Sequence, residues 1–142
     1  MIRIEDSAWT IMLEHAIQAY PRECCGILLG REDEVGQREV SVAVPCVNAY
    51  SGDQSDRFLI DPRDQIAADR RARNEGLDVL GFFHSHPDHA VYFSATDLKN
   101  SWPWYSNLVL SIQGGTFSGA GAFRVDDAQS VATPERLSLP SA

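Results

Sequence analysis

The stretch that decides the fold runs from Val79 to Asp97 and reads VLGFFHSHPDHAVYFSATD. Its opening residues are strongly apolar and predict a buried strand that leads directly into His84-Ser85-His86. Residues i and i+2 of an extended chain point to the same side, so two imidazoles are presented together at the end of that strand. This arrangement of histidines predicts a metal site.

A catalytic zinc site needs a third protein ligand and an open fourth position for water. One candidate is Asp97, in the first turn of a helix that Ser94 begins, where the positive end of the helix dipole favours a carboxylate. The other candidate is Asp88 together with His89, because residues 84–89 spell H-x-H-x-D-H, the zinc motif of the metallo-β-lactamase fold. That fold uses further histidines downstream, and no histidine follows His89.

Ser94 and Asp97 also have the spacing of a helix-capping pair, with a serine at the N-cap and an acid three residues later. The two roles are compatible, because a serine oxygen can accept a backbone N–H while its own proton is donated elsewhere. The spacing alone therefore does not separate a helix cap from a site residue.

The wider pattern, H-x-H followed by seven residues, serine, two residues and aspartate, resembles the signature of the JAMM (MPN-plus) zinc metallopeptidases. That signature also includes a glutamate near the start of an early strand, and Glu23 stands there in the segment PRECCGILLG, residues 21–30. The resemblance covers about residues 1–125 and is to small stand-alone bacterial members that process sulfur-carrier proteins. The residues that match the signature are Glu23, His84, His86, Ser94 and Asp97.

This resemblance implies a mechanism. One Zn²⁺ per chain is held by His84, His86 and Asp97. Glu23 takes a proton from the attacking water and passes it to the leaving amine. Ser94 donates a hydrogen bond to the oxyanion of the tetrahedral intermediate.

The resemblance also implies a partner and a process. A peptide or isopeptide bond is hydrolysed at the C-terminal tail of a ubiquitin-like sulfur-carrier protein, in cysteine or other sulfur-metabolite synthesis. One alternative is a metal-free interaction scaffold, as in related MPN domains without ligands, although all five signature positions are filled here. The other is a metallo-β-lactamase-like hydrolase that uses His84, His86, Asp88 and His89.

Alternating apolar residues and turn signals predict a chain of the α/β (α+β) class. Its mixed, mostly antiparallel sheet is flanked by helices. The resemblance implies a single MPN/JAMM domain with cytidine-deaminase-like layering over residues 1–126, followed by a loose C-terminal tail over residues 127–142. His15 lies off the apolar stripe of the first helix and is expected at the surface. Strands are expected at 2–4, 24–30, 40–44, 57–60, 79–83, 108–112 and 117–125, and helices at 6–20, 62–74 and from 94.

The segments 24–30 and 40–44 are predicted to form a hairpin. A turn centred near Glu34-Val35 would set Cys46 opposite Glu23, so that this thiol could lie near the site. The chain has three cysteines, an odd number, and no thiolate zinc spacing. With no basic-then-apolar secretory signal at the N-terminus, a reducing cytoplasm is the expected location.

The formal net charge of −8 argues against a nucleic-acid partner, because such binding depends on neutralising phosphates. The apolar runs are too short for a membrane span. The partner that the family resemblance implies is the C-terminal tail of a ubiquitin-like sulfur-carrier protein, and the sequence leaves open whether the chain forms a homodimer.

Overall fold

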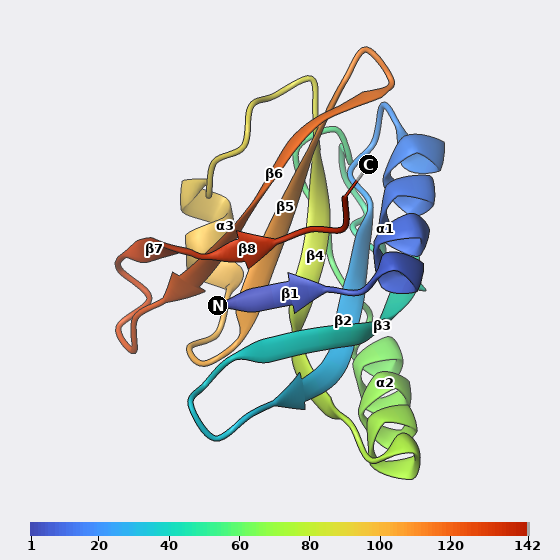
Figure 1. The fold of residues 1–142 in the computed structure, drawn as a ribbon. Coiled ribbons are helices and arrows are strands. Elements are labelled where there is room, and N and C mark those ends of the chain that lie inside the picture. Colours follow the sequence, from blue (N-terminus) through green and yellow to red (C-terminus); the bar gives the residue numbers. More distant parts are fainter. Residues whose placement is uncertain (142) are drawn as a thin grey trace.

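The computed structural model describes residues 1–141, which form one eight-stranded sheet with three helices packed against it (Figure 1). The strand order is β7-β6-β5-β4-β2-β3-β1-β8. The elements are β1 (Ile2–Ile4), α1 (Asp6–Ala19), β2 (Cys25–Glu32), β3 (Arg38–Cys46), α2 (Pro62–Glu75), β4 (Asp78–Pro87), α3 (Ala95–Asn100), β5 (Ser106–Gln113), β6 (Thr116–Val125), β7 (Ala132–Glu135) and β8 (Leu137–Ser138).

The sheet is mixed, as predicted. The pairs β2·β3, β2·β4, β5·β6 and β6·β7 are antiparallel, whereas β1·β3, β1·β8 and β4·β5 are parallel. Among the described residues, none of the helices is long and apolar enough to span a bilayer.

The helices α1 and α2 cover opposite faces of the sheet, because successive side chains of a strand point to opposite sides. On β2, Leu28 packs with Met12 of α1, while Ile27 packs with Ala68 of α2. Cys25 also belongs to the α2 side and is the register partner of His84 on β4. Register partners project to the same face, so His84 lies on the α2 face of the sheet.

The helix α2 begins and ends as its sequence predicts. Asp61 is the N-cap, and its side chain accepts the Arg63 N–H at 2.9 Å. Pro62 occupies the first helical position, where no N–H is needed. Gly76 ends the helix with a φ of 67°, in the left-handed region that favours glycine.

The hairpin of β2 and β3 is confirmed, but its predicted register is wrong. Cys46 lies opposite Cys25, not opposite Glu23. The turn pairs Glu32 with Arg38, and an irregularity at Leu29/Gly30 shifts the register by a further residue. A bulge of this kind inserts one unpaired residue in a strand.

Three further expectations are corrected. Residues 57–60 do not form a strand; only a single bridge joins Asn48 and Ile60. His15 is half-buried, and its Nε2 lies 3.0 Å from the Cys25 carbonyl oxygen and 3.1 Å from that of Cys46. The segment expected as a loose tail contains β7 and β8, which extend the sheet at its two edges.

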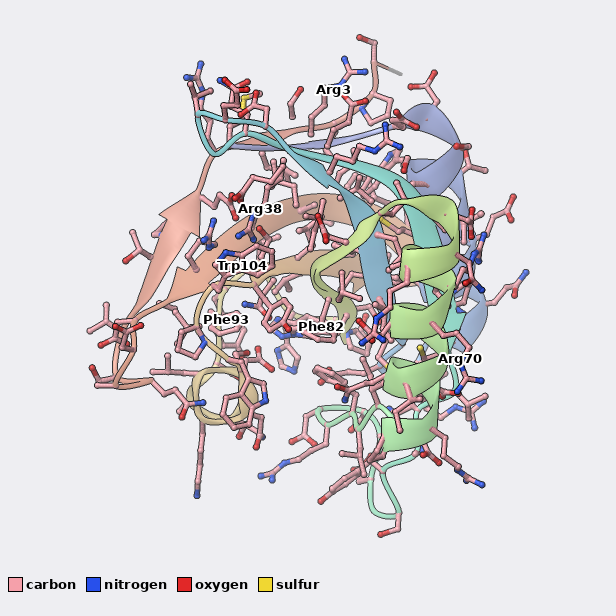
Figure 2. The ribbon with its side chains drawn as sticks, turned by 90° about the horizontal axis from the view of Figure 1, so that it is seen from below. Arg3, Arg38, Arg70, Phe82, Phe93 and Trp104 are labelled. Carbon is pink, nitrogen blue, oxygen red and sulfur yellow. The ribbon has the colours of Figure 1, made fainter. Side chains whose placement is uncertain are left out.

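The tail is attached to the sheet by Glu135 of β7. Its carboxylate accepts the Ser106 hydroxyl at 2.7 Å and lies 3.5 Å from the Arg124 guanidinium. Ser106 in turn accepts a hydrogen bond from the fully buried Arg38 at 3.0 Å. The Arg38 guanidinium stacks over the ring of Trp104, 4.0 Å from its centroid (Figure 2). This chain of contacts ties β7 to the centre of the sheet.

Candidate metal centre

The two imidazoles predicted from the sequence lie side by side at the end of β4. The Nε2 atoms of His84 and His86 are 3.1 Å apart. Asp97 Oδ2 lies 3.2 Å from the first and 3.1 Å from the second. All three side chains are buried. The structure thus brings together three of the residues predicted to form the site.

The positions of these three atoms fit coordination of a metal ion better than they fit hydrogen bonds among themselves. Ligand atoms at 2.0–2.1 Å from a tetrahedral zinc lie about 3.3 Å apart, close to the separations seen here. Protons cannot satisfy the triangle, since hydrogen bonds from both imidazoles to Asp97 leave two N–H donors facing each other. A cation would accept all three lone pairs at once. The donor set, two imidazoles and a carboxylate, is one that catalytic zinc sites use.

Asp97 is held by the first turn of α3. Its Oδ2 accepts the Ser94 N–H at 3.1 Å, and its own N–H donates to Ser94 Oγ at 2.9 Å, which completes a capping box. Burial alone would raise the pKa of Asp97, but the two adjacent imidazoles and the Ser94 N–H hold it well below its ordinary value. The carboxylate is therefore ionised, as a metal ligand requires.

Glu23 reaches the imidazoles from the segment that joins α1 to β2. Its carboxylate and the ring nitrogens of His84 and His86 lie within 4.8 Å of one another. The side chain is 4% exposed, and its Oε1 atom has no hydrogen-bond partner. Burial, with the negative charges of Asp97 and Asp56, raises the pKa of Glu23 to about 9. An unpartnered buried carboxylate oxygen beside two imidazoles fits a site made for a cation or a water.

The competing ligand pair, Asp88 and His89, is not part of this cluster. Both Asp88 oxygens accept the Tyr20 hydroxyl, at 2.8 and 2.7 Å, and Oδ1 also accepts the Gly114 N–H at 2.8 Å. His89 is exposed. Among residues 1–141, the carboxylates grouped with the two imidazoles are those of Glu23 and Asp97, and the group includes neither Asp88 nor His89. The H-x-H-x-D-H interpretation is therefore wrong for this fold.

Aromatic rings flank the imidazoles, a feature that the sequence did not reveal. Phe58 stacks on His84, with ring centroids 4.6 Å apart and planes 23° apart. Tyr92 lies over His86 at 4.9 Å between centroids. Tyr92 is close to the motif in sequence, whereas Phe58 comes from the loop between β3 and α2, and no local signal connects it to the histidines.

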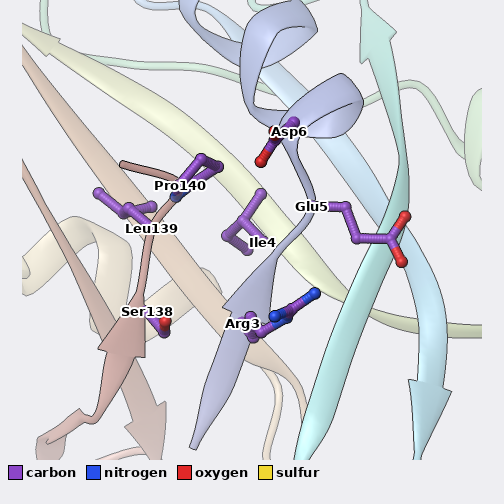
Figure 3. Close-up of a pocket in the computed structure, with 7 residues that line it drawn as sticks. All are labelled: Arg3, Ile4, Glu5, Asp6, Ser138, Leu139 and Pro140. Atoms are coloured by element: carbon purple, nitrogen blue, oxygen red, sulfur yellow. The ribbon is translucent and has the colours of Figure 1, made fainter. Parts of the chain in front are cut away.

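A separate surface cavity of about 330 Å³ lies between β1, the start of α1 and the segment after β8 (Figure 3). Its lining includes Arg3, Glu5, Asp6 and Ser138. It contains none of the metal-site residues.

With this geometry in view, residues 5–125 match the family described as prokaryotic homologs of the JAB domain. The match covers most of the chain, and the chain belongs to this family.

Two known proteins and one solved structure are similar to this chain over most of its length. The chain is 34% identical to the desampylase of Haloferax volcanii over 77% of this chain and 76% of that protein. It is 30% identical to a probable TtuB-protein conjugate cleaving protease of Thermus thermophilus, over 83% and 72% of the two chains. A solved structure from Desulfitobacterium hafniense superposes with a TM-score of 0.85 at 31% identity, over 100% of this chain and 94% of that one. One of these relatives is thus named a desampylase and the other a probable protease that cleaves TtuB-protein conjugates.

Proposed function

We propose that this protein is a zinc-dependent peptidase that hydrolyses a peptide or isopeptide bond at the C-terminal tail of a ubiquitin-like protein, with a sulfur-carrier protein as substrate. The observation that carries the proposal is the convergence of two imidazoles and the Asp97 carboxylate at 3.1–3.2 Å, with Glu23 beside them. The relatives named for cleaving protein conjugates support the substrate class.

The metal ligands in this proposal are His84, His86 and Asp97. When bound, a zinc ion supplies a Lewis acid that lowers the pKa of a coordinated water to about 7 and polarises the scissile carbonyl. Deprotonated ligands are needed, and the low pKa of Asp97 meets that requirement.

Glu23 is the proposed general base. Its carboxylate takes a proton from the attacking water and delivers it to the leaving amine. Its raised pKa describes the protein without a cation, and a nearby divalent charge favours the ionised form. Because water is the attacking group and Glu23 only carries its proton, no covalent enzyme intermediate is needed.

Ser94 is the proposed oxyanion donor. Its oxygen already accepts the Asp97 N–H at 2.9 Å, which fixes the hydroxyl at the N-terminus of α3. The hydroxyl proton remains available for the oxygen of the tetrahedral intermediate. The helix cap predicted from the spacing thereby also orients a catalytic group.

Replacing the base without removing the metal ligands tests the proposal. We expect Glu23→Gln to bind one zinc per chain and to lower kcat by about 10²–10⁴-fold, since that is the range of general acid–base contributions. The matched control is Glu14→Gln, on the exposed side of α1. Zinc content and cleavage of a ubiquitin-like protein with a C-terminal extension are measured together. Parental kcat in Glu23→Gln would contradict the assignment of the base, and loss of zinc would make Glu23 a ligand.

A further inference from the structure

Glu23 occupies a segment that no strand ladder holds. It lies after α1, which ends at Ala19, and before β2, which begins at Cys25. Buried backbone groups outside a ladder must find other partners, and those partners fix the path of the chain. Oε1 of Glu23 makes no hydrogen bond, so the contacts of the Glu23 backbone are what fix the point from which the side chain starts.

The loop between β3 and α2, residues 47–61, supplies those partners. The Glu23 N–H donates to the Gln54 carbonyl at 2.7 Å. The Glu23 carbonyl accepts Nδ2 of Asn48 at 3.1 Å. Both polar groups of the Glu23 backbone are therefore bonded to this one loop, which also carries the ring of Phe58 that stacks on His84.

The side-chain amide of Asn48 joins several backbone groups of that loop to Glu23. Its Nδ2 donates to the Arg57 carbonyl at 2.9 Å as well as to Glu23. Its Oδ1 accepts the N–H groups of Tyr50 and Leu59, each at 3.1 Å. Two donors and two acceptor lone pairs are the whole capacity of an asparagine amide, and all are used. These four bonds set the orientation of the amide and direct one N–H at Glu23.

From this arrangement we infer that Asn48 is a positioning residue for Glu23: its amide fixes the Glu23 backbone and so aims the carboxylate at the imidazole pair. The inference rests on the proposed function, because it assigns Asn48 a role through the proposed base. The four hydrogen bonds of the Asn48 amide include none to His84, His86 or Asp97. Loss of Asn48 should therefore lower the rate of the chemical step and leave metal binding unchanged.

A double-mutant cycle separates this role from simple loop stabilisation. Asn48→Ala should lower kcat by about 10–100-fold with KM changed less than twofold, because displacement of a catalytic group by about 1 Å costs about 10² in rate. In the Glu23→Gln background, Asn48→Ala should lower kcat no further, since residues that act through one another are not additive. Zinc affinity should stay within twofold of the parent.

The matched control is Ser51→Ala, an exposed position in the same loop. It should leave kcat unchanged. If Asn48→Ala fails to fold, Asn48→Asp retains the acceptor for Tyr50 and Leu59 and replaces the two donors with a carboxylate oxygen that faces the Glu23 and Arg57 carbonyls.

A crystal structure and the measured kcat values test the role of Asn48 independently. A crystal structure of the Asn48 variant should show the Glu23 carboxylate displaced and the three ligands in place. Parental kcat in the variant, an additive loss in the Glu23→Gln background, or an unmoved carboxylate would each overturn the inference. An inactive wild-type enzyme would count against the proposed function instead, and the carboxylate position would then decide the role of Asn48 alone.

Discussion

At the scale of single residues, the site combines two carboxyl groups whose surroundings push them in opposite directions. Asp97 faces two imidazoles and a backbone N–H, which keep its pKa low. Glu23 faces burial and other negative charges, which raise its pKa to about 9. Such pairs are typical of sites in which one carboxylate binds and the other transfers a proton.

The assignment of the third ligand makes a first prediction. Asp97→Ala should lower zinc affinity by more than about 100-fold, since even outer partners of metal ligands contribute about 10–100-fold. Asp88→Ala is the matched control and should bind zinc as the parent does, because its carboxylate is bonded to Tyr20 and Gly114. Titration with a chromophoric chelator measures both affinities. Stoichiometric zinc in Asp97→Ala, with loss in Asp88→Ala, would restore the H-x-H-x-D-H interpretation.

The raised pKa of Glu23 makes a second prediction, for the metal-free protein. Between pH 4.5, its ordinary pKa, and about pH 9, the unfolded chain ionises this group while the folded chain keeps it protonated. The unfolded state then binds fewer protons, so its stability relative to the folded state improves as pH rises. Glu23 should therefore lower the free energy of unfolding by up to about 1.4 kcal/mol per pH unit in this range.

Urea denaturation in chelator, at several pH values from 5 to 9, measures that slope. Glu23→Gln lacks the titrating group, so its free energy of unfolding should fall less steeply with pH than that of the parent. Equal slopes in the two proteins would show that the pKa of Glu23 is not raised.

At the scale of elements, β7 is attached to the sheet by the buried polar contacts of Glu135. Glu135→Ala leaves the Ser106 hydroxyl without its acceptor and Arg124 without its ion pair. We expect a loss of about 1–3 kcal/mol in the free energy of unfolding, the cost of leaving buried polar groups unsatisfied. The control Glu34→Ala, in the exposed hairpin turn, should change it by less than about 0.5 kcal/mol. Equal stability of the two variants would contradict the attachment.

The elements that the sequence predicted well are those with a local signal. The α1 stripe, the Asp61-Pro62 helix start and the apolar run before His84 each carry their own periodicity or cap. The elements missed depend on distant partners. β7 has no apolar alternation of its own and forms because β6 offers an unpaired edge. The hairpin register depended on an irregularity at Leu29/Gly30, which a regular pairing counted from the turn does not include.

The same division holds at the site. His84, His86, Ser94 and Asp97 lie within one short segment. Spacing alone paired the two histidines and left Asp97 and the Asp88/His89 pair as alternatives, and the family pattern favoured Ser94 and Asp97. Glu23 was placed only through the family pattern, and its geometry agrees with that pattern. Phe58 and Asn48 could not be found from the sequence, because their contacts with the site arise from a loop that has no regular secondary structure.

At the scale of the whole molecule, β4 and α3 carry the three proposed ligands, and the loop of residues 47–61 carries the groups that hold Glu23. The ligands sit at the end of β4 and at the start of α3, the crossover helix between β4 and β5. The four proposed site residues thus lie on separate parts of one framework, with His84 and His86 on β4, Asp97 on α3 and Glu23 in the segment before β2.

The most direct test of the central claim is the mass of the product. A ubiquitin-like sulfur-carrier protein with an extension after its C-terminal tail is incubated with the zinc-loaded enzyme, and the intact masses are measured with and without chelator. We expect a shortened carrier with a new carboxyl terminus. It should form only when zinc is present, and Glu23→Gln should not form it. Cleavage that continues at the parental rate in chelator, or an uncut carrier in the presence of stoichiometric zinc, would contradict it.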